Sequence, residues 1–194
     1  MQFQIEGTTF VKLDEEAQEK RFVIPDGITQ IKRFAFYSCK QVEEVVIPDS
    51  VTEIGDCAFM YSGLTSLVVP DSVTEMGREI CSECRRLTRA VIGRGITRLR
   101  ERTFEYCQSL EHLELPEGLE RIESRALEEC YSLRTVWVNG KEYRIRDPEA
   151  PKPVQLVYDH LEDIRDRIRA YYESGAMDEF EYIDYQIAGD GYDY

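Results

Sequence analysis

The clearest pattern in the chain is a short unit of apolar and polar positions that recurs every 22 or 23 residues. Each unit contains an apolar triplet, a turn, a quartet with apolar ends, and a small residue beside a bulky one. Five turns carry Pro or Gly beside polar residues, and a sixth follows at the same spacing: residues 24–27, 47–50, 69–72, 92–95, 115–118 and 138–140. A fixed period of this length is typical of a solenoid, in which each unit stacks on its neighbours.

The triplet before each turn has the alternation of a β-strand. In residues 45–47, 67–69 and 90–92 both outer side chains are apolar. Side chains alternate along a strand, so the outer pair faces the core and the middle residue faces outward. Stacking the units in parallel aligns the outward residues in two columns. The first column is Val23, Val46, Val68, Val91, Glu114 and Trp137, and the second is Arg21, Glu44, Ser66, Arg89, His112 and Thr135.

The second half of each unit predicts a corner that fills the core. Quartets such as residues 51–54 have apolar ends and a polar middle, and pairs such as residues 35–36 place a small residue beside a bulky one. This pairing suits a tight bend whose bulky side chain packs inside. The last recurring position holds Cys39, Ser62, Cys84, Cys107 and Cys130. The second unit is one residue short between Ser62 and Leu64, which accounts for the single spacing of 22.

The two ends of the chain depart from the repeat. Residues 1–21 resemble two short strands around Gly7, which predicts a β-hairpin cap, and residues 22–146 form the predicted solenoid. Residues 147–194 form the predicted C-terminal helical cap, since a solenoid exposes its core unless its ends are covered. Apolar residues at intervals of three and four predict a helix there: Val154, Val157, Leu161, Ile164, Ile168 and Tyr171. A second short helix is predicted from Met177, Phe180, Ile183 and Ile187.

The repeat resembles the BspA-type leucine-rich repeat over about residues 22–138. That pattern is approximately L-x-x-(V/I/L)-x-(I/V)-P-x-(S/G)-(V/I/L)-x-x-(I/V/L)-x-x-x-A-F-x-x-C. The resemblance implies an α+β repeat fold, a right-handed solenoid with a short parallel sheet along one face. Proteins of this type are mostly bacterial or protozoal, are often found on cell surfaces, and are associated with adhesion and protein binding.

Net charge limits the classes of partner. The chain carries a formal charge of −14, which disfavours direct binding to nucleic acid and permits a basic protein partner. About half of that charge, and seven of the twelve tyrosines, fall within residues 151–194. The N-terminus shows no secretory signal, and no apolar stretch is long enough to cross a membrane. We therefore expect a cytoplasmic protein with no membrane contact, unless a leader has been removed.

The sequence offers no catalytic site, cofactor site or metal site. The only histidines, His112 and His160, lie in no nucleophile or metal motif, and no glycine-rich phosphate loop is present. The six cysteines favour buried, reduced thiols. A disulfide between adjacent units, such as Cys107 with Cys130, is sterically conceivable. Zinc is disfavoured because the ladder spacing does not match a zinc knuckle.

The preferred hypothesis is a non-enzymatic module that binds another protein through the outward strand face and the acidic C-terminal helices. Its candidate contact residues are Val46, Val68, Arg89, Val91, His112, Glu114, Trp137, Asp178, Glu179, Glu181 and Asp184. Exposed apolar stripes are typical of interfaces. The opposing interpretation is that the valines only favour strand formation, or that the C-terminal helix covers them and packs on Trp137.

Two other functions remain open from the sequence. An acidic inhibitor could occupy the nucleic-acid channel of an enzyme, as small phage or mobile-element inhibitors of nucleases do, with carboxylates in place of phosphates. Its binding to a basic enzyme would be steeply salt-sensitive. A bacterial surface adhesin is the third hypothesis, and it requires a leader. The sequence predicts no oligomeric state.

Overall fold

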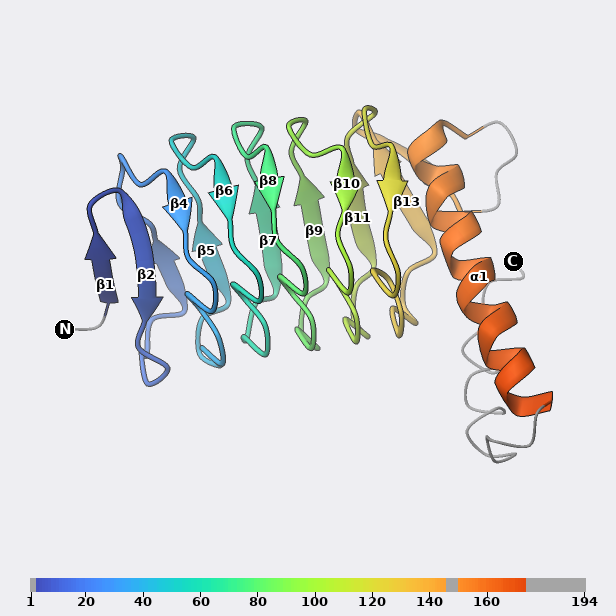
Figure 1. Ribbon diagram of the computed structural model, residues 1–194, viewed down its shortest axis with the longest axis horizontal. Helices are drawn as coiled ribbons and strands as arrows, with labels where there is room; N and C mark the ends of the chain where they lie inside the picture. Colours follow the sequence, from blue (N-terminus) through green and yellow to red (C-terminus); the bar gives the residue numbers. More distant parts are fainter. Residues whose placement is uncertain (1–2, 146–149, 174–194) are drawn as a thin grey trace.

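The computed structural model describes residues 3–145 and 150–173 of the chain, and it shows an elongated stack of similar coils (Figure 1). A β-hairpin lies at one end of the stack and a single helix at the other (Figure 1). Each coil contributes one strand to a continuous sheet on one side and a shorter strand to a second side. The predicted solenoid with a parallel sheet is therefore confirmed.

The continuous sheet has seven strands in the order β14-β13-β11-β9-β7-β5-β3. Its strands are β3 (Arg21–Val23), β5 (Glu44–Val46), β7 (Ser66–Val69), β9 (Arg89–Ile92), β11 (His112–Leu115), β13 (Thr135–Val138) and β14 (Lys141–Arg144). All neighbours are parallel except β14, which is antiparallel to β13. Equivalent residues stand opposite one another along both predicted outward columns, as in Val68 with Val91, except between Val46 and Val68, which are not paired.

The turn at Asn139 and Gly140 differs in geometry from the earlier ones. Both residues have positive φ, 52° for Asn139 and 72° for Gly140. An Asn-Gly pair in this conformation is the preferred two-residue turn of an antiparallel hairpin. A sixth turn does lie at the predicted spacing, but the chain reverses through it and β14 returns alongside β13.

A second set of short strands lies on the other side of the coil, and the sequence analysis predicted only the two hairpin strands near its N-terminus. One group contains β1 (Phe3–Glu6), β2 (Thr9–Leu13), β4 (Gln30–Ile31), β6 (Glu53–Ile54) and β8 (Glu75–Met76). The other contains β10 (Arg98–Leu99) and β12 (Arg121–Ile122). Apart from β1 and β2, these strands come from the quartets after each turn, whose apolar ends are buried in the core, as at Ile54 and Leu99. β1 and β2 form the antiparallel hairpin at the N-terminal end.

The corners between the two sides form their own hydrogen-bonded ladder. The Phe36 N–H donates to the Ala58 carbonyl at 2.7 Å, and the Phe104 N–H donates to the Ala126 carbonyl at 2.8 Å. Ten non-glycine residues at these corners have positive φ, in two series with the repeat spacing: Phe34, Cys57, Glu79, Arg102 and Arg125, and Ser38, Tyr61, Glu83, Tyr106 and Glu129. Few non-glycine residues adopt this region, so neighbouring coils must hold these turns in place.

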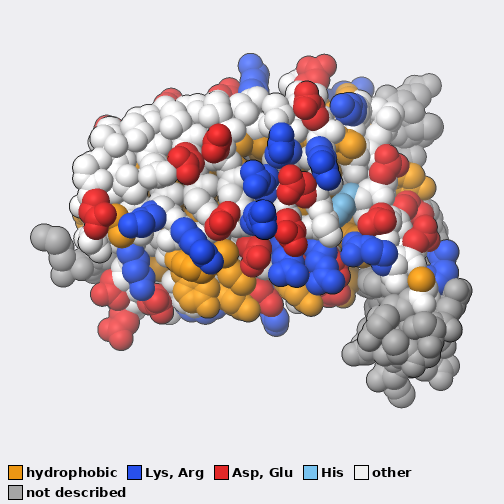
Figure 2. All heavy atoms as spheres, viewed as in Figure 1, with side chains coloured by type: hydrophobic (Ala, Val, Ile, Leu, Met, Phe, Trp, Pro, Cys, Tyr) orange, Lys and Arg blue, Asp and Glu red, His pale blue; other side chains and the backbone are white. Residues whose placement is uncertain are grey.

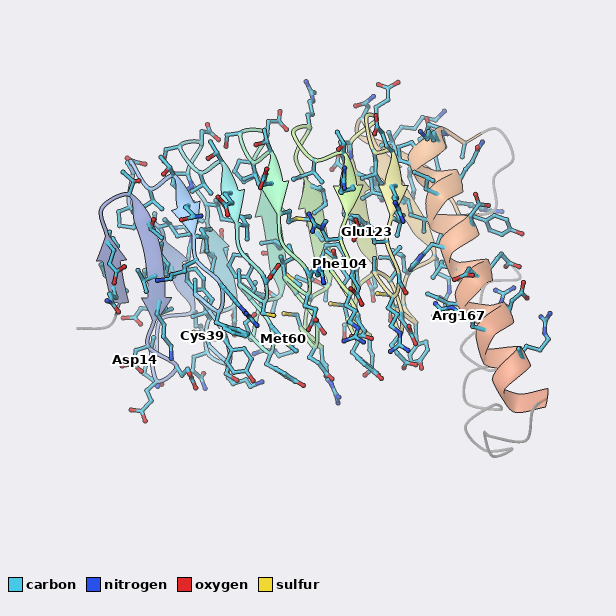
Figure 3. All side chains as sticks on the ribbon, in the orientation of Figure 1. Asp14, Cys39, Met60, Phe104, Glu123 and Arg167 are labelled. Atoms are coloured by element: carbon cyan, nitrogen blue, oxygen red, sulfur yellow. The ribbon has the colours of Figure 1, made fainter. Side chains whose placement is uncertain are left out.

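The core is a stack of equivalent side chains along the length of the solenoid. Phe36 lies between Phe10 and Phe59, at ring-centroid distances of 4.9 and 5.2 Å. All six cysteines are buried and reduced, as predicted. The Cys107 and Cys130 thiols donate to backbone carbonyls at 3.1 and 3.2 Å rather than bonding to each other. Figure 3 shows the sulfur atoms inside the coil and labels Cys39.

Helix α1 (Lys152–Glu173) packs against the last coil, with contacts to β12 and β13 (Figure 1). The helix confirms the predicted amphipathic segment, since Val154 and Val157 are fully buried and Ile164 is nearly so. His160 is also buried on this face. Its Nε2 atom accepts a hydrogen bond from the Leu127 N–H at 3.3 Å. The predicted second helix, at residues 177–187, lies outside the described residues.

Gly63, in the second repeat, lies close to the backbone of Lys40 in the preceding coil. A Cβ atom added there would lie 2.0 Å from the Lys40 carbonyl oxygen. We expect Gly63→Ala to lower the free energy of unfolding by about 2 kcal/mol, because the backbone of one coil must move. Gly118→Ala is the matched control, since nothing lies within 4 Å of its added Cβ. Urea unfolding of both variants measures the difference, and equal midpoints would show that the Lys40 contact relaxes without cost.

Candidate functional site

The outward face of the seven-stranded sheet carries the predicted apolar stripe. Val23 and Val68 are each 53% exposed, whereas Val46 and Val91 are half-buried. The alternating burial of β7, with Leu67 and Val69 inside and Val68 outside, follows the predicted pattern. Helix α1 does not cover this stripe, because it packs against the last coil. The valines therefore lie on the surface of the sheet.

A polar and aromatic cluster continues the stripe toward the C-terminal end. The His112 ring lies against the Trp137 ring, with centroids 4.8 Å apart. The Glu114 carboxylate lies 3.9 Å from the Arg89 guanidinium and 4.0 Å from the His112 Nε2 atom. Burial, followed by the charge of Arg89, lowers the pKa of His112. The structure thus brings Arg89, Val91, His112, Glu114 and Trp137 together on one face.

A groove opens beside Val68, between β5 and β7. Its volume is about 600 Å³. The residues that line it are Glu44, Val45, Val46, Ile47, Asp49, Ser66, Val68, Pro70, Asp71 and Ser72. The sequence analysis named Val46 and Val68 but missed Asp49, Pro70 and Asp71, because it treated the turns only as structural signals. The one sequence feature that sets this part of the solenoid apart is the 22-residue spacing of the second repeat.

The opposite side of the coil, the face of β4, β6 and β8, has a different character. Figure 2 shows acidic and basic side chains interspersed over this face. A depression of about 680 Å³ there is lined by four cationic side chains and three carboxylates: Lys32, Arg33, Arg98, Arg100, Glu53, Asp56 and Glu75. Because both signs are present, this depression favours no class of charged ligand.

An aromatic edge, also missed from the sequence, lies at the corners of the first two repeats. The Phe34 and Tyr37 rings are 5.4 Å apart, and the Tyr37 and Tyr61 rings are 5.8 Å apart. Arg33 and Lys40 lie over the outer rings of this row. Apolar side chains gather along the lower edge in Figure 2, at the place where Figure 3 labels Met60. The residue type at these corner positions varies between repeats, so aligning the units does not identify the aromatic side chains as a group.

The remaining predictions concern chemistry and the acidic C-terminus. Among residues 3–145 and 150–173, no group of three or more His, Cys, Asp or Glu side chains could hold a metal ion. Within the same residues, no helix has the length and apolarity needed to cross a membrane. The candidate contacts Asp178, Glu179, Glu181 and Asp184 lie outside the described residues, so their role stays a prediction.

Comparisons with known proteins agree with the repeat pattern. A sequence profile of the BspA type leucine rich repeat region matches residues 15–147 in six copies. A search of curated proteins found no match. Among solved structures, a leucine-rich repeat protein from Eubacterium ventriosum matches with a TM-score of 0.66 and 21% identity, over 68% of this chain and 36% of that chain.

Two further solved structures share the fold. The pneumococcal vaccine antigen PcpA matches with a TM-score of 0.55 and 23% identity, over 62% of this chain and 31% of that chain. A leucine-rich repeat protein from Bacteroides ovatus matches with a TM-score of 0.50 and 25% identity, over 62% of this chain and 38% of that chain. The chain thus spans about a third of the length of each of these three proteins.

Proposed function

The chain belongs to the BspA-type leucine-rich repeat family, and from this premise we propose that it is a protein-interaction module whose binding surface is the outward face of the seven-stranded sheet. The observation that carries the proposal is the valine stripe. Val68 is 53% exposed although it lies on β7, in the middle of the seven-stranded sheet. Apolar side chains aligned over several strands form a contiguous patch, and such patches usually mark an interaction site.

The neighbouring polar cluster supports the same surface. Trp137 and His112 present two rings in contact, tilted by 31°, beside the paired charges of Arg89 and Glu114. Trp and Arg are enriched among the residues that contribute most to binding at interfaces. The valine row offers a partner apolar contact area, and the aromatic and charged residues at its end fix the orientation in which the partner binds. No catalytic role is proposed for His112.

We expect the double substitution Val68→Ala and Val91→Ala to weaken partner binding at least about tenfold. Each change removes two carbon atoms of apolar contact, and each buried methylene contributes about 0.8 kcal/mol. Binders selected from a displayed peptide library against the full chain provide the probe, and titration of each variant gives the dissociation constant. The free energy of unfolding should change by less than about 1 kcal/mol, because both side chains lie outside the core.

The matched control is Thr74→Ala with Thr97→Ala, two exposed residues on the other side of the coil. This variant should bind like the original chain. If the two valine changes unfold the protein, the valines are core residues and the surface assignment is wrong. If the valine and threonine variants bind equally well, the sheet face is not the binding surface.

A further inference from the structure

The groove between β5 and β7 lies next to the short second repeat. β3 and β5 have three aligned residue pairs, and β7 and β9 have four. β5 and β7 have one, Glu44 with Ser66, so the pairing stops before Val46 and Val68. The missing residue lies just upstream, where Gly63 brings its backbone against Lys40. The pairing is therefore confined to the strand starts, and the groove lies beside the unpaired residues Val46 and Val68.

The groove has an apolar floor and an acidic rim. Val46, Val68 and Pro70 supply apolar surface, and Glu44, Asp49 and Asp71 supply three carboxylates. No Lys or Arg side chain is among the lining residues. Its volume of about 600 Å³ falls in the range of sites that enclose a ligand or several partner side chains.

Two of the rim carboxylates have arginine partners outside the groove. The Arg21 Nε atom lies 3.0 Å from the Glu44 carboxylate, and the Arg94 Nε atom lies 3.8 Å from the Asp71 carboxylate. Both pairs are well exposed, and pairs of this kind contribute little to stability. A partner's cation can therefore approach these carboxylates at small cost. Asp49 is exposed on the same rim and adds a further negative charge.

We propose that this groove receives a peptide segment in which an apolar side chain is flanked by Lys or Arg. The inference rests on the proposed function and specifies its partner. The apolar side chain would lie on Val46 and Val68, and the flanking cations would face Asp49 and Asp71. Charge complementarity selects this occupant over an acidic peptide, because the rim is acidic and the whole chain carries −14.

The test begins with random twelve-residue peptides displayed and selected against the full chain. We expect the enriched sequences to share an aliphatic or aromatic residue with Lys or Arg within two positions on each side. A synthetic peptide of that consensus is then compared with two variants, one with the apolar residue changed to Ser and one with the cations changed to Gln. Each variant should bind at least about tenfold more weakly, measured by fluorescence anisotropy.

Matched protein variants then locate the binding. Asp49→Asn with Asp71→Asn should reduce affinity about tenfold and flatten its salt dependence. Asp26→Asn with Glu117→Gln makes the same change in net charge at equivalent turns of other repeats, and should stay within about twofold of the original chain. Val68→Thr should weaken binding, whereas Val23→Thr should not, although both valines are 53% exposed.

The outcomes separate this inference from the proposed function. Equal losses from the two carboxylate pairs would indicate general electrostatic attraction and would overturn the groove assignment. A consensus without Lys or Arg would also overturn it. Binders that depend on Val68 and Val91 but tolerate the Asp49 and Asp71 changes would support the sheet face as the binding surface and overturn the groove assignment. Binders that tolerate both sets of changes would overturn both proposals.

Discussion

Replacing Phe36 with alanine is expected to lower the free energy of unfolding by about 4 kcal/mol. The Phe36 side chain has no exposed surface, and its ring stacks between Phe10 and Phe59. A fourth ring, Phe22, meets it edge-on at 5.6 Å. Truncation removes all three ring contacts and leaves a cavity that the surrounding coils cannot fill, because each coil is fixed by hydrogen bonds to its neighbours.

Urea unfolding followed by circular dichroism measures this loss. Phe36→Leu keeps most of the volume and should lose less than about 1.5 kcal/mol. Phe34→Ala is the matched surface control in the same repeat, since Phe34 is 38% exposed, and it should lose less than about 1 kcal/mol. A loss at Phe36 no larger than that at Phe34 would contradict the stacked core. Because coils contact only their neighbours, the first coils should unfold before the last in the Phe36→Ala variant.

The repeated core and the outward columns could be predicted because they depend on alternation alone. Leu67 and Val69 flank Val68 in the sequence. A strand must point Leu67 and Val69 to one face of the sheet and Val68 to the other. The repeat then fixes the register, since equivalent residues in successive units must stack. The helix at residues 152–173 was equally readable, because its apolar positions follow the helical period over several turns.

The second sheet and the corner turns could not be predicted in the same way. Strands of two residues, such as β6, are too short for an alternation pattern to identify. Phe34 and Tyr61 adopt positive φ although neither is a glycine, the residue type from which such a turn is predicted. The neighbouring coil, and not local preference, therefore sets their conformation. The groove lies where the pairing of β5 with β7 stops, and only the three-dimensional register shows that.

His160 was visible in the sequence only as a histidine on a helix, and its role comes from the end of the ladder. At earlier corners the equivalent N–H donates to the next coil, as Phe104 does to Ala126 at 2.8 Å. Leu127 has no following coil, and its N–H donates to the His160 Nε2 atom at 3.3 Å. The imidazole therefore takes the place of a backbone carbonyl. Only a neutral imidazole has the lone pair that accepts this bond.

Acidification is therefore expected to destabilise the chain through His160. Burial, followed by the nearby positive charge of Arg167, lowers the pKa of His160 from 6.5 to about 4. Since the folded pKa is depressed, the unfolded state binds the proton more tightly, and the stabilisation is complete above pH 6.5 and is lost as pH falls toward 4. The loss from this residue should be about 2 kcal/mol between pH 7 and pH 5.

The variant His160→Leu separates this effect from other titrations. At pH 7.5 it should be less stable than the original chain by about 2 kcal/mol, because the buried Leu127 N–H loses its acceptor. That difference should shrink as pH falls through 6.5, since leucine cannot be protonated. His160→Gln supplies an amide oxygen in place of the imidazole nitrogen and should recover part of the stability at pH 7.5 without restoring the pH dependence. Urea unfolding of the three proteins at pH 7.5, 6.0 and 5.0 measures both quantities. A constant difference between the original chain and His160→Leu would show that His160 has the same pKa in the folded and unfolded states, and that the end of the ladder is not a pH-sensitive contact.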